Sequence, residues 1–98
     1  MATVKWLPQA QRELRAIHDF LARVSPDYGA LVSARIVTAT LRLEVFPRSG
    51  RIVPEIGLDD VREVFYRTYR IVYVVVSDER VDVLTVLPSS RPLGTPGV

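Results

Sequence analysis

The sequence contains no cysteine and only one histidine. Without cysteine, neither a disulfide framework nor a thiolate zinc site can form. A single histidine would leave any metal site to carboxylate oxygens, so we expect neither a metal nor another cofactor.

Long apolar runs are also missing. No run approaches the roughly 20 residues that a membrane-spanning helix needs. The first residues, MATVKWLPQAQREL, lack the basic segment and apolar core of a secretory signal. We therefore expect a cytoplasmic protein with no membrane partner.

The length and composition predict a single globular domain over residues 1–98. A chain of 98 residues is close to the commonest domain size, and 48% hydrophobic with 24% charged residues is ordinary for a folded protein. Thirteen basic and eleven acidic residues give a net charge of +2 and a pI near 9.4. This excess is too small to require a nucleic-acid partner.

The N-terminal half predicts a strand followed by two helices. Residues 3–7 alternate as a strand does, and Pro8 suits the first turn of a helix. Apolar residues then recur at steps of three and four over residues 9–23, and again over residues 25–45. Because the connection at Ser25 and Pro26 is very short, the two helices should form an antiparallel hairpin.

The C-terminal half predicts a loop and three strands. Residues 46–57 hold two prolines and two glycines and should form a loop. Valine, tyrosine and phenylalanine are enriched over residues 61–67, 69–77 and 81–87, which is typical of consecutive antiparallel strands, and the tail from about residue 88 resembles a loop. We expect an α+β fold in which the helical hairpin packs on a mainly antiparallel sheet of about four strands.

The stretch YRTYRIVYVVV begins with tyrosines and arginines and then becomes wholly apolar. Its loss of alternation predicts a central strand that is buried on both faces. Tyr69, Ile71 and Tyr73 should share one face, which leaves Arg70 on the other. Two interpretations of Arg70 stay open: a rim arginine that reaches water or a carboxylate such as Glu63, or an arginine that faces an anion in a concave site.

The order of these elements resembles the ParE/RelE superfamily of bacterial toxins from type II toxin–antitoxin pairs. The motifs that carry this resemblance are FPRSGR at 46–51, VREVFYRTYRIVYVV at 61–75 and VLTVLPSSRPL at 83–93. The resemblance implies a cognate antitoxin whose C-terminal segment folds across the helical hairpin and the sheet. It also implies that operator DNA is contacted only through the antitoxin.

Two activities are known in this superfamily. RelE-like toxins cleave mRNA in the ribosome with basic residues at the phosphate, whereas ParE-like toxins poison DNA gyrase by binding. Arg70 and Arg91 fall on or near arginines of the RelE-like active site, but the strand that supplies two lysines there offers only Arg62 and adds Glu63. No histidine precedes Arg91 at the end of the last strand. These departures favour gyrase inhibition, with mRNA cleavage as the alternative and a non-toxic, partner-binding member as a third possibility.

The resemblance also supplies candidate site residues. No residue is assigned firmly to catalysis, and the candidates are Arg62, Arg70, Arg91 and Glu55. Glu55 matches the position of a general base in one nuclease subgroup, or is simply a solvated loop carboxylate. The candidates for target binding are Arg67, Tyr69, Arg70 and Arg91, although the tyrosine is also suited to packing across the sheet. We interpret His18 as a solvated helix residue.

Overall fold

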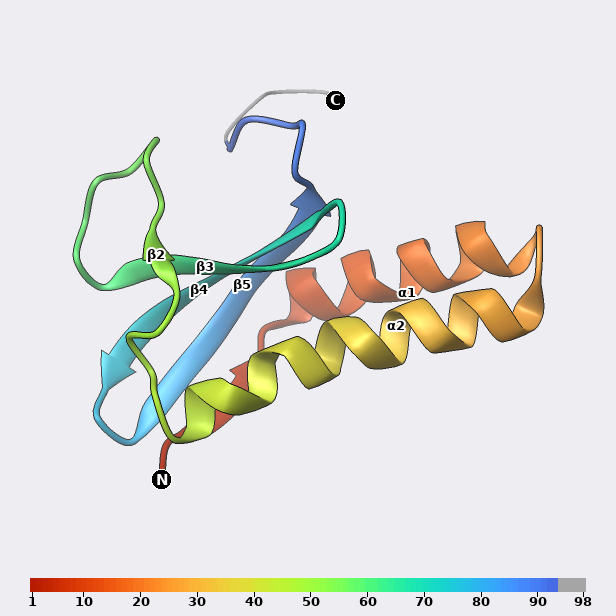
Figure 1. Ribbon diagram of the computed structural model, residues 1–98. Helices are drawn as coiled ribbons and strands as arrows, with labels where there is room; N and C mark the ends of the chain where they lie inside the picture. The colour runs from red at the N-terminus through yellow and green to blue at the C-terminus, as the bar shows by residue number, and fades with distance from the viewer. Residues whose placement is uncertain (94–98) are drawn as a thin grey trace.

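The computed structural model describes residues 1–93, which form a helical hairpin lying against one face of a sheet (Figure 1). The elements in chain order are β1 (Thr3–Trp6), α1 (Pro8–Ala22), α2 (Pro26–Leu41), the 3₁₀ turn η1 (Arg42–Glu44), β2 (Arg51–Ile52), β3 (Val61–Tyr66), β4 (Tyr69–Ser77) and β5 (Arg80–Pro88). This is the predicted α+β order of strand, helical hairpin, loop and three strands.

The sheet has five strands in the order β1-β5-β4-β3-β2. β1 runs parallel to β5, and the other neighbours are antiparallel. The sequence predicted about four strands, and the additional one is β2, whose two residues pair with Glu63 and Arg62 of β3. Two residues within a loop of prolines and glycines are too few to show a strand period, so only the pairing reveals β2.

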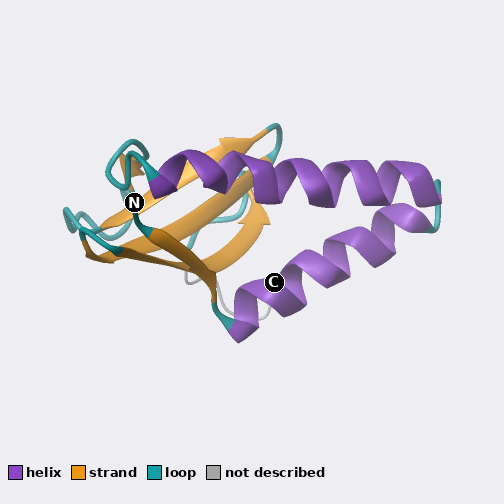
Figure 2. Ribbon diagram, turned by 90° about the horizontal axis from the view of Figure 1, so that it is seen from below, coloured by secondary structure: helices purple, strands orange, loops and turns teal. Residues whose placement is uncertain are grey.

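Both helices of the hairpin begin at the prolines that the sequence predicted as helix starts, and Ser25 caps the second helix. Pro8 and Pro26 occupy the first helical turns, and the Ser25 hydroxyl accepts a hydrogen bond from the Tyr28 N–H at 3.3 Å. The helices lie close together at their connection and spread apart toward the other end (Figure 2). Gly29 permits the close approach, since a Cβ there would lie 2.8 Å from the His18 carbonyl oxygen. Neither helix is long and apolar enough to cross a membrane, nor is any other helical segment within residues 1–93.

The sheet separates a large core from a small one. The large core lies between the helices and the sheet and contains Ile36, Leu43, Ile71 and Tyr73, while Tyr69 packs against its edge. On the opposite face, Val53, Val72 and Leu87 form a second buried cluster, against which Leu93 of the tail packs. β4 is therefore buried on both faces, as predicted, because the loop before β3 and the tail cover the outer side.

Candidate functional site

Arg70 of β4 lies on the outer face of the sheet between two carboxylates. Its Nε donates to Glu63 of β3 at 2.8 Å, and its two Nη atoms donate to the two carboxylate oxygens of Glu55 at 2.7 and 3.1 Å. The Arg70 side chain is 6% exposed and that of Glu63 is fully buried. Of the two interpretations of Arg70, the structure therefore shows pairing with carboxylates, and it places the arginine inside the protein and away from the rim.

This cluster of Arg51, Glu55, Glu63 and Arg70, here called the outer-face network, reaches further along the chain. Glu63 also accepts from Arg51 Nε of β2 at 2.6 Å. Glu55 accepts from the Leu93 N–H at 3.0 Å, and Arg70 donates to the carbonyl oxygen of Arg91 at 3.2 Å. The network thus fastens the loop and the start of the tail onto the sheet.

The electrostatics of the network favour the charged forms. The hydrogen bonds from Arg70, followed by the backbone N–H of Leu93, lower the pKa of Glu55 to about 2. The hydrogen bond to Glu55 raises the pKa of Arg70 despite the opposing effect of burial. Both groups are therefore ionised at neutral pH, and each satisfies the other. Within residues 1–93 there is no group of three or more acidic or histidine side chains that could hold a metal ion.

Arg62 anchors the loop that precedes its own strand. Its Nε donates to the Asp59 carbonyl at 2.9 Å, and Nη1 donates to the carbonyl oxygens of Gly50 at 2.9 Å and Arg48 at 3.1 Å. Nη2 donates to the Asp59 carboxylate at 2.9 Å. The side chain is only 15% exposed. The structure therefore separates Arg62 from Arg70, although both were candidates for one catalytic site.

A second set of candidates gathers at the end of the molecule where the β3–β4 turn meets the tail. The Ser89 N–H donates to the Thr68 carbonyl at 2.6 Å, which holds the turn and the tail together. A pocket of about 350 Å³ lies between this junction and α1, and it is lined by Glu13, Ala16, Ile17, Phe20, Tyr69, Val86, Pro88 and Arg91. Burial raises the pKa of Tyr69. We call this pocket and the adjacent turn the turn-end surface.

The two arginines of the turn-end surface have no carboxylate partner within residues 1–93. The Nε of Arg91 is buried and has no acceptor there. The Arg67 guanidinium lies 5.7 Å from the centre of the Tyr66 ring, and its Nε donates to the Tyr66 hydroxyl at 3.2 Å. The four candidate target-binding residues thus divide, because three lie at this surface and Arg70 lies in the outer-face network.

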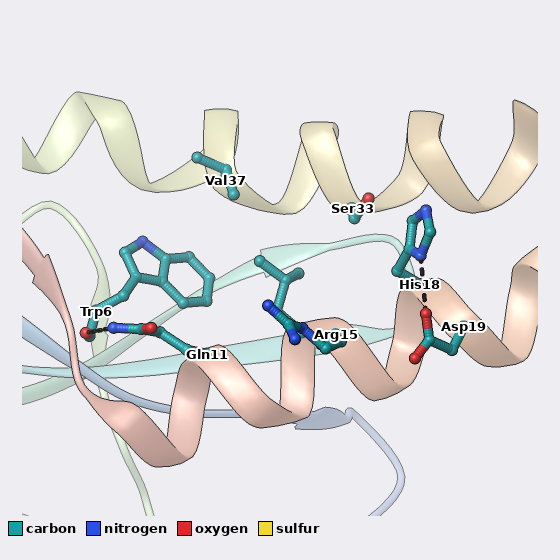
Figure 3. A pocket seen from close by; sticks show the side chains of 8 residues that line it. Trp6, Gln11, Arg15, His18, Asp19, Ser33 and Val37 are labelled. Atoms are coloured by element: carbon teal, nitrogen blue, oxygen red, sulfur yellow. Dashed lines mark hydrogen bonds and ion pairs between the residues drawn. The ribbon is translucent and has the colours of Figure 1, made fainter.

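A wider groove runs between the two helices where they spread apart (Figure 3). Its volume is about 690 Å³, and it is lined by Trp6, Gln11, Leu14, Arg15, His18, Asp19, Ser33 and Val37. Side chains from α1 and α2 face each other across it, and Trp6 of β1 lies at one end. His18 Nδ1 lies 3.1 Å from the Asp19 carboxylate, and both are well exposed. His18 therefore lines a groove, which the sequence did not indicate.

Three residues of these surfaces were not predicted from the sequence. Glu13 and Phe20 line the pocket of the turn-end surface, and Trp6 lines the groove between the helices. Phe20 lies outside the apolar stripe of its helix, and it is 63% exposed. An exposed phenylalanine at a polar position of a helix is a signal that could have been used. The two hydrogen bonds of the Glu13 carboxylate come from Thr85 and the Val86 N–H of β5, and no local pattern indicates this pairing.

The fold and these sites define a small α+β domain of the kind found in toxins of toxin–antitoxin pairs. A family model described as the ParE toxin of the type II toxin–antitoxin system parDE matches residues 4–93, and the chain belongs to this family. Among solved structures, it is similar to a chain of the chromosomal ParDE TA system from P. aeruginosa, with a TM-score of 0.74 and 20% identity. That match covers 90% of this chain and 96% of the other.

No curated protein sequence matches significantly. At 20% identity, the structural match shows a shared fold, and the family model carries the assignment. The family model agrees with the superfamily that the motifs at 46–51, 61–75 and 83–93 indicated, and with the ParE-like branch that the missing lysines and histidine favoured. The resemblance predicted from the sequence is therefore confirmed.

Proposed function

We propose that this ParE-family toxin acts by binding DNA gyrase, without a catalytic step, and that a cognate antitoxin neutralises it. Family membership makes the chain a toxin of a type II pair. The observation that carries the choice of target is the state of Arg70, whose three nitrogens all donate to the carboxylates of Glu55 and Glu63.

Cleavage of RNA requires groups that stabilise charge on the phosphate or move a proton at the attacking hydroxyl. An arginine serves this purpose only if its donors can reach the phosphate. Around Arg70 the two carboxylates already occupy these donors, and their negative charge would repel a phosphate approaching the same face. To free Arg70, Glu63 would have to stay buried without this partner, which is costly.

The other candidates support the same conclusion. Arg62 donates to three backbone carbonyls and one carboxylate of its own loop. Glu55 has a pKa of about 2, which is far too low for a general base at neutral pH. The mRNA endonuclease alternative would therefore need Arg91 to act without its expected neighbours.

For the antitoxin, we propose the groove between α1 and α2 as the main docking site. At about 690 Å³ it is larger than the pocket of the turn-end surface, and Trp6, Leu14 and Val37 supply apolar surface within a polar rim. An amphipathic helix that lays its apolar face into such a groove is a common mode of peptide recognition. Operator DNA would then be contacted by the antitoxin part of the complex.

The test compares two assays on one protein preparation. Purified toxin is titrated into a gyrase supercoiling and cleavage-complex assay, and in parallel into ribosomes programmed with mRNA. We expect inhibited supercoiling with intact mRNA, and restored supercoiling after incubation with the antitoxin. Cleaved mRNA with unaffected gyrase would instead support the endonuclease. A folded toxin that is inactive in both assays, but binds the antitoxin, would support a non-toxic member.

A further inference from the structure

The turn-end surface presents two arginines, Arg67 and Arg91, that no carboxylate among residues 1–93 neutralises. The buried Nε of Arg91 has no acceptor within residues 1–93, and a buried donor without a partner costs free energy. Glu13 is the carboxylate that lines the pocket, and one of its oxygens accepts hydrogen bonds from the Thr85 hydroxyl at 2.7 Å and from the Val86 N–H at 3.2 Å. One oxygen of Glu13 is thus held by β5, and within residues 1–93 no acceptor reaches the Nε of Arg91.

Arg67 adds an independent observation. It has a φ of 50°, and no other non-glycine residue among residues 1–93 has a positive φ. This left-handed conformation is unfavourable for an arginine, and glycine or asparagine is the usual choice in such a turn. A strained residue at an exposed tip is a reason to look for a function. Here the strained residue is a cation in the turn whose next residue, Thr68, accepts the hydrogen bond from Ser89 of the tail that carries Arg91.

Apolar surface borders these two arginines. Phe20 is 63% exposed and lines the pocket together with Ile17 and Tyr69. Tyr28 of α2 is also exposed, and it lies near enough to Tyr69 and Arg67 to interact electrostatically with both. Aromatic side chains and arginine are the residue types that contribute most to protein interfaces.

We propose that the turn-end surface is the contact for the target, and that it accepts an acidic segment of gyrase. An apolar side chain of this segment enters the pocket beside Phe20, and a neighbouring carboxylate accepts hydrogen bonds from Arg91 and Arg67. This inference rests on the proposed function and adds the binding surface and the chemistry of its partner.

A polypeptide fits this surface better than a nucleic acid does. The walls of the pocket are mainly apolar, which suits an apolar side chain better than a phosphate backbone. A volume of about 350 Å³ is at the small end of the range for ligand pockets, and it has room for one large apolar side chain. The net charge of +2 is also small for a protein that binds nucleic acid through its backbone.

The turn-end surface and the helical groove lie on opposite sides of α1. The groove is lined by Gln11, Leu14, Arg15 and His18, and the pocket by Glu13, Ala16, Ile17 and Phe20. At 100° per residue, the two sets point in opposite directions from the helix axis. Target binding and antitoxin binding should therefore respond to different substitutions.

The experiment measures gyrase inhibition and antitoxin affinity on the same variants of the full chain. Arg91→Gln removes the partly buried cation, and Arg67→Asn removes the exposed one while keeping a residue that tolerates the left-handed turn. Arg12→Gln is the matched control, since it removes the same charge from an exposed position on α1. Thermal melting of each variant shows whether it is folded.

We expect Arg91→Gln and Arg67→Asn each to raise the toxin concentration for half-inhibition of gyrase about tenfold or more. Antitoxin affinity should stay within about twofold, and Arg12→Gln should change neither quantity. Half-inhibition within twofold of wild type for both variants would overturn the inference. So would a parallel loss of gyrase and antitoxin binding in folded protein, because the two sites would not be separate.

Two further outcomes distinguish the inference from the function on which it rests. If the wild-type toxin does not inhibit gyrase at all, the proposed function fails, and the inference fails with it. If wild type binds a 30-nucleotide single-stranded DNA without gyrase, and the two arginine variants lose that binding, the occupant is a nucleic acid. The acidic polypeptide would then be wrong although the surface is right.

Discussion

The guanidinium of Arg70 and the carboxylate of Glu55 lie side by side, joined by hydrogen bonds of 2.7 and 3.1 Å, although Glu55 belongs to a loop and Arg70 to the central strand. Because Glu55 also accepts from the Leu93 N–H, this pair connects the loop, the sheet and the tail. The arginine that resembles a catalytic residue is therefore part of the framework that closes the outer face.

The Glu55 carboxylate should make stability depend on acid pH. Its pKa is lowered from 4.5 to about 2 in the folded protein, so the stabilisation is fully present above pH 4.5 and is lost as pH falls toward 2. We expect the free energy of unfolding of wild type to fall more steeply in this window than that of Glu55→Gln. Urea titrations at several pH values measure this difference, with Glu79→Gln on the surface as control. Parallel pH profiles for wild type and Glu55→Gln would contradict the prediction.

Truncation of Arg70 should destabilise the fold itself. In Arg70→Ala, the buried Glu63 keeps only Arg51 as an ion-pair partner. Glu55 loses the ion pair that it makes with Arg70. Breaking a buried pair in this way costs about 3 kcal/mol. Urea unfolding should show this loss, whereas Arg12→Ala at an exposed site should change stability by less than about 0.5 kcal/mol. An unchanged urea midpoint for Arg70→Ala would show that the network does not stabilise the protein.

Gly50 should tolerate no side chain. A Cβ at this position would lie 2.5 Å from the Glu63 carbonyl oxygen and 2.6 Å from the Tyr73 hydroxyl. The first of these is backbone of β3 and cannot move without disturbing the sheet. We expect Gly50→Ala to lower the free energy of unfolding by about 2 kcal/mol or more. Ser49→Ala, one residue away and exposed, is the control, and equal stability of the two variants would refute the steric argument.

The Tyr73 hydroxyl should stabilise the folded protein through its contact with Gly50. It accepts a hydrogen bond from the Gly50 N–H at 3.0 Å in a buried position. Tyr73→Phe keeps the ring in the core but leaves that N–H without an acceptor, which should cost about 1–3 kcal/mol. Urea unfolding measures the loss, and a variant as stable as wild type would mean that water or another group replaces the hydroxyl.

Arg67 should be a position where stability and activity oppose each other. Its φ of 50° costs about 1–2 kcal/mol for a non-glycine residue, while its exposed contact with Tyr66 returns only about 0.5–1 kcal/mol. Arg67→Gly should therefore raise the melting temperature slightly and still impair gyrase inhibition. Thr68→Gly is the control, because Thr68 has no positive φ, and it should lower the melting temperature. A lower melting temperature for Arg67→Gly would remove the argument from strain.

Several elements could be predicted from the sequence because their signals are local. The steps of three and four in residues 9–23 and 25–45, with Pro8 and Ser25 before them, specify the helical hairpin. The apolar run 69–76 indicates a strand buried on both faces, and the alternation predicts that Tyr69, Ile71 and Tyr73 share one face. The structure turns that face toward the helices. These features depend on neighbours within a few residues, so periodicity and capping reveal them.

The candidate site was predictable only in part. Motif spacing identified Arg62, Arg67, Arg70 and Arg91, but it suggested that Arg62 and Arg70 serve one site, and the structure separates them. The partners of Arg70 belong to a loop and to a different strand, and the acceptor missing from Arg91 becomes apparent only when the pocket is formed.

The sequence by itself thus determined the order of the elements, the faces of the central strand and the family, because these follow from residue types at fixed local spacing. The tertiary structure decided that Arg70 is neutralised and that, within the described residues, Arg67 and Arg91 are not. It did so because an arginine is neutralised only by a carboxylate within hydrogen-bonding distance, and such distances depend on how loop, strand and tail come together in space.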